Sequence, residues 1–115
     1  MPHISQRKLK KHTFIKISNQ LINVIAKQNS HDTKLLLKEL LTPTEKIMLA
    51  KRLALIFMIA HNYPFRKMGR ELKISPSTIA RFWKMEKQNS FTNILLLQKN
   101  KSGKGFWTEL KKFLR

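Results

Sequence analysis

Cysteine is absent from the 115-residue chain, and acidic residues are scarce. Without cysteine there is neither a disulfide framework nor thiolate chemistry, which suits a reducing cytoplasm. Asp32 is the only aspartate, and the four histidines are scattered along the chain, so we expect no metal site and no cofactor. The sequence also lacks a glycine-rich phosphate loop and a serine-nucleophile motif. These absences argue against an enzyme.

Long hydrophobic runs are also absent. The most apolar run, 53–60, is far shorter than the roughly 20 residues that a membrane-spanning helix needs. The N-terminal region is basic, and the segment after it mixes polar residues into its apolar ones, unlike a signal peptide. We therefore expect a soluble, cytoplasmic protein with no membrane partner.

Positive charge is abundant. The chain has 24 Lys and Arg against 6 Asp and Glu, a formal net charge of +18. Such a chain attracts polyanions, but charge alone does not separate DNA from RNA, a ribosome or an anionic membrane.

Apolar spacing predicts helices throughout and no strands. Residues 13–28 fit one amphipathic helix, and 33–41 fit a shorter one that Asp32 can cap. Thr42, Pro43 and Glu45 form a capping box at the start of a long helix. From 47 to 60 this helix is almost wholly apolar, so it needs cover on several sides. A homodimer with interleaved helices would provide that cover; the alternative is that the terminal helices of the same chain suffice.

The most informative segment is 65–84, which has the pattern of a helix-turn-helix. Gly69 would let two short helices approach closely, while Ser75 caps the second helix and Pro76 fits its first turn. Apolar side chains supply the contacts between these helices and a stripe that faces inward: Met68, Leu72, Ile74, Ile79, Phe82 and Trp83. Lys73 stands where many such turns have glycine. A left-handed backbone would be strained there, so we expect the turn geometry to differ somewhat.

Small, polar and basic residues occupy the other side of the second helix. Short residues let a helix enter the major groove of DNA, and an arginine there can bond a guanine edge. An ordinary helical hairpin with a solvated basic face explains the agreement of spacing, cap and charge less well. We therefore predict double-stranded DNA as the partner, with these contacts: Arg66, Lys67, Arg70, Lys73, Ser75, Ser77, Thr78, Ala80, Arg81 and Lys84.

Three regions follow from this pattern. Residues 1–12 form a basic arm, in which 6–12 either reach a minor groove or stay solvated. Residues 13–98 form the helical dimerisation and DNA-binding domain, with a helical segment at 91–98. Residues 99–115 join a flexible stretch at 100–105, with two glycines, to an amphipathic helix. Core packing explains that helix better than membrane binding. Its expected apolar face is Phe106, Trp107, Leu110, Phe113 and Leu114.

Residues 40–84 resemble the core of the Trp repressor family. The motifs that carry the resemblance are Leu41-Thr42-Pro43 with Glu45, Lys51-Arg52-Leu53, Arg70-Glu71-Leu72 and Thr78-Ile79-Ala80-Arg81. The resemblance implies an all-α fold, an intertwined homodimer and paired recognition helices that read a palindromic operator; Trp repressor is a standard helix-turn-helix example.

The resemblance also implies an effector pocket, with Arg52 and Arg81 at the positions of the family's two tryptophan-holding arginines. Directly after the second arginine the family's pattern has a glycine. This chain has Phe82 at that position and Trp83 at the next. Added bulk would overlap an indole ring, and Glu39 replaces an apolar wall residue. We therefore predict a regulator that works without tryptophan as corepressor.

Two other functions fit the charge. One is a non-specific RNA- or ribosome-associated protein, although the chain shows no RNA-module signature. The other is a DNA-docking helical module of a mobile-element system, which would use the same residues.

Overall fold

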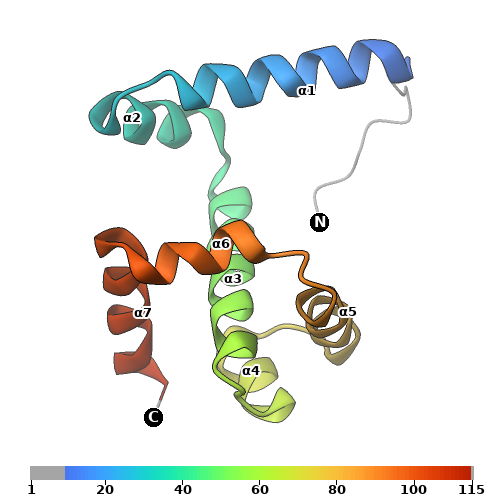
Figure 1. The fold of residues 1–115 in the computed structure, drawn as a ribbon, viewed down its shortest axis with the longest axis vertical. Coiled ribbons are helices and arrows are strands. Elements are labelled where there is room, and N and C mark those ends of the chain that lie inside the picture. The colour runs from blue at the N-terminus through green and yellow to red at the C-terminus, as the bar shows by residue number, and fades with distance from the viewer. Residues whose placement is uncertain (1–9, 115) are drawn as a thin grey trace. The chain divides into compact units, whose positions relative to one another are not determined.

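The computed structural model describes residues 10–114, which form two compact units divided between Met48 and Leu49. The described residues form α-helices joined by short turns and one 3₁₀ helix, and they contain no strand (Figure 1). The all-α prediction is therefore confirmed. The part of the expected arm at 1–9 lies outside the described residues.

The first unit contains α1 (Lys11–Ala26), α2 (Ser30–Leu40) and the start of α3 (Pro43–Ala60). The cap of α2 differs from the expected one, because the side chain of Asn29, not Asp32, fills this role. Asn29 Oδ1 accepts a hydrogen bond from the backbone N–H of Asp32 at 2.8 Å, and Asp32 sits in the first turn. The helix therefore begins three residues earlier than predicted.

The capping box at the start of α3 is confirmed. The backbone N–H of Thr42 donates to Glu45 Oε1 at 2.9 Å, and the backbone N–H of Glu45 donates to Thr42 Oγ1 at 3.1 Å. These reciprocal bonds satisfy two N–H groups near the start of the helix. The sequence therefore fixes where this helix begins.

The second unit contains the rest of α3, α4 (Phe65–Leu72), α5 (Pro76–Lys87), α6 (Thr92–Leu96), the 3₁₀ helix η1 (Leu97–Lys99) and α7 (Lys101–Phe113). Its core is built around residues 54–59 of α3, all of them buried. Phe57 meets the rings of Phe106 and Trp107 edge-on, at centroid distances of 5.6 Å and 6.3 Å. The C-terminal helix of the same chain therefore covers part of the apolar α3 segment, as the alternative to a dimer requires.

The expected flexible joint at 100–105 is wrong as regards secondary structure, because α7 begins at Lys101. The Asn100 side chain caps this helix by accepting from the backbone N–H of Gly103 at 2.9 Å. Gly103 packs so closely on η1 that an added Cβ would overlap the carbonyl group of Leu97. The glycine thus serves a close approach within a helix.

The apolar face predicted for the C-terminal helix is largely confirmed. Phe106, Trp107 and Leu110 pack against the core, and Leu114 is itself buried. Phe113 is the exception, since 75% of its surface is exposed. Trp107 also stacks on His61, with ring centroids 4.1 Å apart, which ties α7 to the end of α3.

Candidate nucleic-acid interface

Helices α4 and α5 form the helix-turn-helix predicted from the sequence. Met68 and Ile79 are fully buried between the helices and α3, and Leu72 and Ile74 pack against the same cluster. A Cβ added at Gly69 would lie 3.3 Å from the carbonyl oxygen of Ile74 and 3.4 Å from Ile79 Cδ1. The approach to the Ile74 carbonyl oxygen is tighter than ordinary van der Waals contact, and the approach to Ile79 is at its lower limit. The expected role of Gly69 in a close helix approach is therefore confirmed.

The turn between the helices passes through Lys73, which adopts the left-handed conformation with φ 54° and ψ 51°. Lys73 thus adopts the conformation that is usual for glycine, at a cost in backbone strain, contrary to the expected difference in turn geometry. The ammonium group of Lys51 lies 3.5 Å from the carbonyl oxygen of Lys73, a long hydrogen bond that helps to hold the turn. The side chain of Lys73 itself is exposed.

Three hydroxyl side chains gather at the start of α5. Ser75 Oγ accepts a hydrogen bond from the backbone N–H of Thr78 at 3.4 Å, as the predicted cap requires. It also lies 3.0 Å from Thr78 Oγ1 and 3.2 Å from Ser77 Oγ. Pro76 occupies the first turn, where its missing N–H is harmless. The cluster fixes the start of the helix and leaves Ser77 exposed.

The outward side of α5 carries exposed small, polar and basic residues: Ser77, Ala80, Arg81 and Lys84. Thr78 is only partly exposed, because it takes part in the capping cluster. The guanidinium carbon of Arg81 lies 5.4 Å from the ring centroid of Phe82, within the range of a cation–π contact. The sequence therefore predicted correctly which side of α5 is exposed.

Trp83 does not join the inward stripe as predicted. Ile79 and Phe82 are buried, but 43% of the Trp83 surface is exposed. Its ring meets Phe65 edge-on at 6.3 Å, and the Lys87 ammonium lies 5.4 Å from its centroid. Trp83 therefore lies beside the core, at the edge between α4 and α5, because Ile79 and Phe82 already fill the inward side.

Basic side chains lie along α4 and in the turn that follows it. Arg66, Arg70 and Lys73 are exposed, and Lys67 is partly exposed. Arg70 Nε lies 3.6 Å from Glu71 Oε1, a surface pair that contributes little to stability. This side of the helix pair therefore carries a concentration of positive charge.

The two arginines of the implied effector pocket lie on different helices. Arg52 is on α3 and Arg81 is on α5, and both are exposed. Phe82, directly after Arg81, is buried and stacks on Phe91, with ring centroids 5.7 Å apart. The bulky residue that distinguishes this chain from the family's pattern is thus part of the hydrophobic core.

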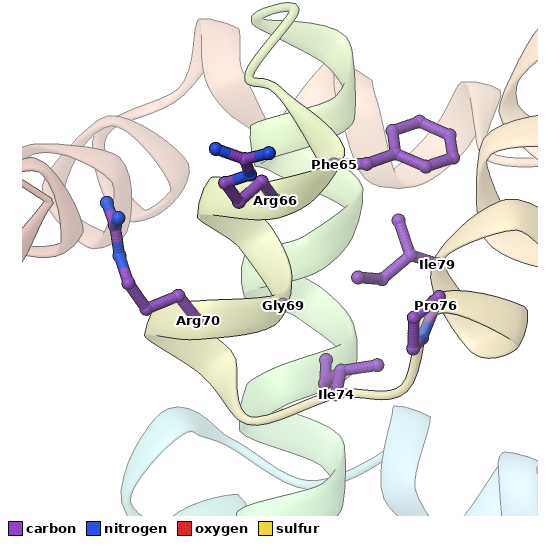
Figure 2. A pocket seen from close by; sticks show the side chains of 7 residues that line it. All are labelled: Phe65, Arg66, Gly69, Arg70, Ile74, Pro76 and Ile79. Carbon is purple, nitrogen blue, oxygen red and sulfur yellow. The ribbon is translucent and has the colours of Figure 1, made fainter.

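A groove between α4 and α5 is a feature that the sequence did not predict. It has a volume of about 380 Å³ and is lined by Phe65, Arg66, Gly69, Arg70, Ile74, Pro76 and Ile79. Figure 2 shows apolar side chains around the space between the two helices, while Arg66 and Arg70 extend from α4. The signal in the sequence is Gly69 between Arg66 and Arg70, two arginines that are four residues apart and share one helix face.

Metal-binding clusters and membrane-spanning helices are both absent from residues 10–114. No group of three or more histidine, cysteine or acidic side chains could hold a metal ion there. Within the same residues, no helix has the length and apolar character to cross a membrane.

The family model described as Trp repressor protein matches residues 16–101, more than half of the chain. The match includes α2 to α6 and therefore the whole helix-turn-helix. This family consists of regulatory DNA-binding proteins and not of enzymes. No curated protein and no solved structure shows significant similarity to the chain.

Proposed function

Since the chain belongs to the Trp repressor family of helix-turn-helix DNA-binding regulators, we propose that it is a sequence-specific, repressor-like transcriptional regulator that acts as a homodimer. The observation that carries the proposal is the two-sided character of α5. Ile79 and Phe82 anchor one side in the core, while the opposite side is exposed and ends in basic residues. A rigidly held helix with such a side can enter the major groove.

Within this proposal, base edges and phosphates are contacted by different residues. The groove contacts come from the exposed side and start of α5, namely Ser77, Thr78, Ala80, Arg81 and Lys84. Arg81 is the side chain with the geometry to bond guanine bidentately. Arg66, Lys67, Arg70 and Lys73 hold the motif on the phosphates, and Ser75 orders the start of α5 beside them.

The homodimer is supported by the apolar surface of α1. Six of its large apolar side chains are exposed: Phe14, Ile15, Ile17, Leu21, Ile22 and Val24. Exposed apolar side chains in such number mark an interaction surface more often than bare solvent contact. A two-fold pair of chains would present two α5 helices to half-sites about 34 Å apart, one turn of DNA.

The regulator is further proposed to act without tryptophan as corepressor. The two positions after Arg81 hold bulky side chains, Phe82 in the core and Trp83 partly exposed at the edge between α4 and α5, where the family's pattern begins with a glycine. We expect saturating tryptophan to leave the affinity for the operator unchanged in a fluorescence anisotropy titration. A severalfold gain in affinity would contradict this part of the proposal.

Selection of binding sites from a random duplex library tests the main proposal. About 0.15 M salt is needed, because a weakly screened charge of +18 would otherwise mask specificity. We expect an enriched palindrome with half-sites one turn apart. No enrichment, with equal binding to RNA, would favour a general nucleic-acid binder, for which the net charge is the supporting observation.

The assignment of residues is tested with two variants. Arg81→Ala should cost about 1–3 kcal/mol on the selected operator and little on random DNA, because it removes a base contact. Lys67→Ala should weaken both duplexes alike, because phosphates carry no sequence information. Equal losses in the two variants would show that the roles are wrongly assigned.

A further inference from the structure

The groove between α4 and α5 has the size and lining of a small-molecule site. Its volume of about 380 Å³ falls within the range of roughly 300–1,000 Å³ typical of ligand pockets. Phe65, Ile74, Pro76 and Ile79 form the apolar part of the lining. Such a lining favours a compact apolar group over water.

The groove depends on the absence of a side chain at Gly69. A Cβ there would lie 3.3 Å from the Ile74 carbonyl oxygen and 3.4 Å from Ile79 Cδ1. Both helices are fixed on α3 through the buried Met68 and Ile79. The walls are therefore held in place by the core, so the groove is formed before a ligand arrives.

Charge in the groove has one sign. Arg66 and Arg70 are one helical turn apart on α4, and the lining contains no acidic residue. The link between Arg70 and Glu71 is a 3.6 Å surface contact, which a stronger anionic partner can displace. In Figure 2 both side chains extend from α4 away from Ile74, Pro76 and Ile79, so their guanidinium groups reach the rim of the groove only after rotation about the side-chain bonds.

We propose that this groove binds a small organic monocarboxylate with a compact apolar body. The body would lie on Phe65, Ile74 and Pro76, with the buried Ile79 behind them, and the carboxylate would be held by Arg66 and Arg70. A planar guanidinium binds a carboxylate through two parallel hydrogen bonds. A free α-amino acid fits less well, because its ammonium group finds no acidic partner in the lining. The site shares no residue with the Arg52 and Arg81 pair.

The site would regulate DNA binding by competition, and this part rests on the proposed function. Arg66 and Arg70 are proposed phosphate contacts, so a bound carboxylate would withdraw two positive charges from the DNA. Loss of phosphate contacts weakens binding to all sequences and lowers its dependence on salt. The ligand would thus release the protein from DNA.

Binding is tested first on the full chain without DNA. Isoleucine methyl NMR spectra would be recorded during titration with 3-phenylpropanoate, a carboxylate with an apolar body. We expect saturable shifts at Ile74 and Ile79. The alcohol 3-phenylpropanol, acetate, inorganic phosphate and phenylalanine should each bind at least about tenfold more weakly, since each lacks one required feature or adds an unpaired ammonium.

Two variants and a control identify the residues. Arg66→Gln and Arg70→Gln should each weaken the probe about tenfold. Lys104→Gln removes an exposed positive charge outside the groove and should leave the affinity for the probe unchanged. Both arginines are exposed, so their variants should keep the circular dichroism spectrum and melting temperature of the parent chain.

The outcomes separate the ligand site from the proposed function. Absence of shifts at Ile74 and Ile79, equal binding of phosphate, or unchanged affinity in both arginine variants would overturn the site. A saturable probe that fails to displace a bound operator duplex in fluorescence anisotropy would overturn the competition. If the probe binds but the library selection yields no operator, the site stands and the proposed function fails.

Discussion

The two units of the chain use their apolar residues in opposite ways. In the second unit, six consecutive residues of α3 are buried by neighbours from the same chain. In the first unit no described residue is buried, although α1 carries Phe14 with 57% of its surface exposed. Similar apolar content thus gives a core in one case and an open surface in the other. An apolar stripe shows that a helix needs a partner, but it does not say which chain supplies it.

The largest expected change in stability follows a substitution in the buried core of the second unit. Phe57 has no exposed surface and contacts two aromatic rings of α7. Phe57→Ala should lower the free energy of unfolding by about 3–5 kcal/mol, because it removes a large core side chain and leaves a cavity. Urea titration followed by circular dichroism measures the loss. Phe113→Ala, at a position 75% exposed, is the control and should change it by less than about 0.5 kcal/mol.

A smaller loss of stability is expected at the contact between η1 and α7, also in the second unit. Gly103→Ala places a Cβ against the carbonyl group of Leu97, so η1 and α7 must move apart. We expect a loss of about 1–3 kcal/mol in the free energy of unfolding, as for other overpacked sites. A stability equal to that of the parent chain in urea titration would show that this junction yields without cost.

The exposed apolar surface of α1 in the first unit is tested by measuring dimer formation. If two chains pair through α1, Phe14→Ala should weaken the dimer about tenfold, corresponding to about 1.4 kcal/mol. Sedimentation equilibrium gives the dissociation constant directly, since the protomer mass is 13.6 kDa. Lys16→Ala, an exposed polar position on the same helix, should leave it unchanged. A parent chain that stays monomeric at all concentrations would remove α1 as a dimer surface.

The smallest effect has the opposite sign. Nothing lies within 4 Å of a Cβ added at Gly105, two residues beyond Gly103 on α7. Gly105→Ala should raise the free energy of unfolding by roughly 0.5–1 kcal/mol, because alanine is the better helix former. Thermal melts of the two alanine variants, compared side by side, check that opposite signs arise from packing alone.

Much of the fold could be predicted because local chemistry determined it. The capping box at Thr42 and the Ser75-Pro76 start of α5 depend only on residues a few positions apart. Each of these features is set by hydrogen bonding and backbone preference within one helical turn, so the sequence alone contains the necessary information.

The errors arose where distant contacts decide the outcome. Two glycines within three residues predict a break, yet Gly103 is in helix because its missing side chain lets α7 pack on Leu97. The spacing of Trp83 predicts an inward side chain, but Ile79 and Phe82 fill the inward side and leave Trp83 at the edge. The α4–α5 groove has the same origin, since it depends on how two helices are held on α3. Periodicity gives the face of a helix but not the distance to its neighbour.

The left-handed backbone conformation of Lys73 lowers stability, while its side chain serves the proposed contact with DNA. Glycine at this turn would relieve roughly 1 kcal/mol of backbone strain and would also remove a positive charge from the side of the motif that meets phosphate in the proposed function. A search for more stable variants would therefore choose glycine there, and the variant would hold DNA less firmly. The turn is a position at which a protein optimised for folding and a protein optimised for its ligand would diverge.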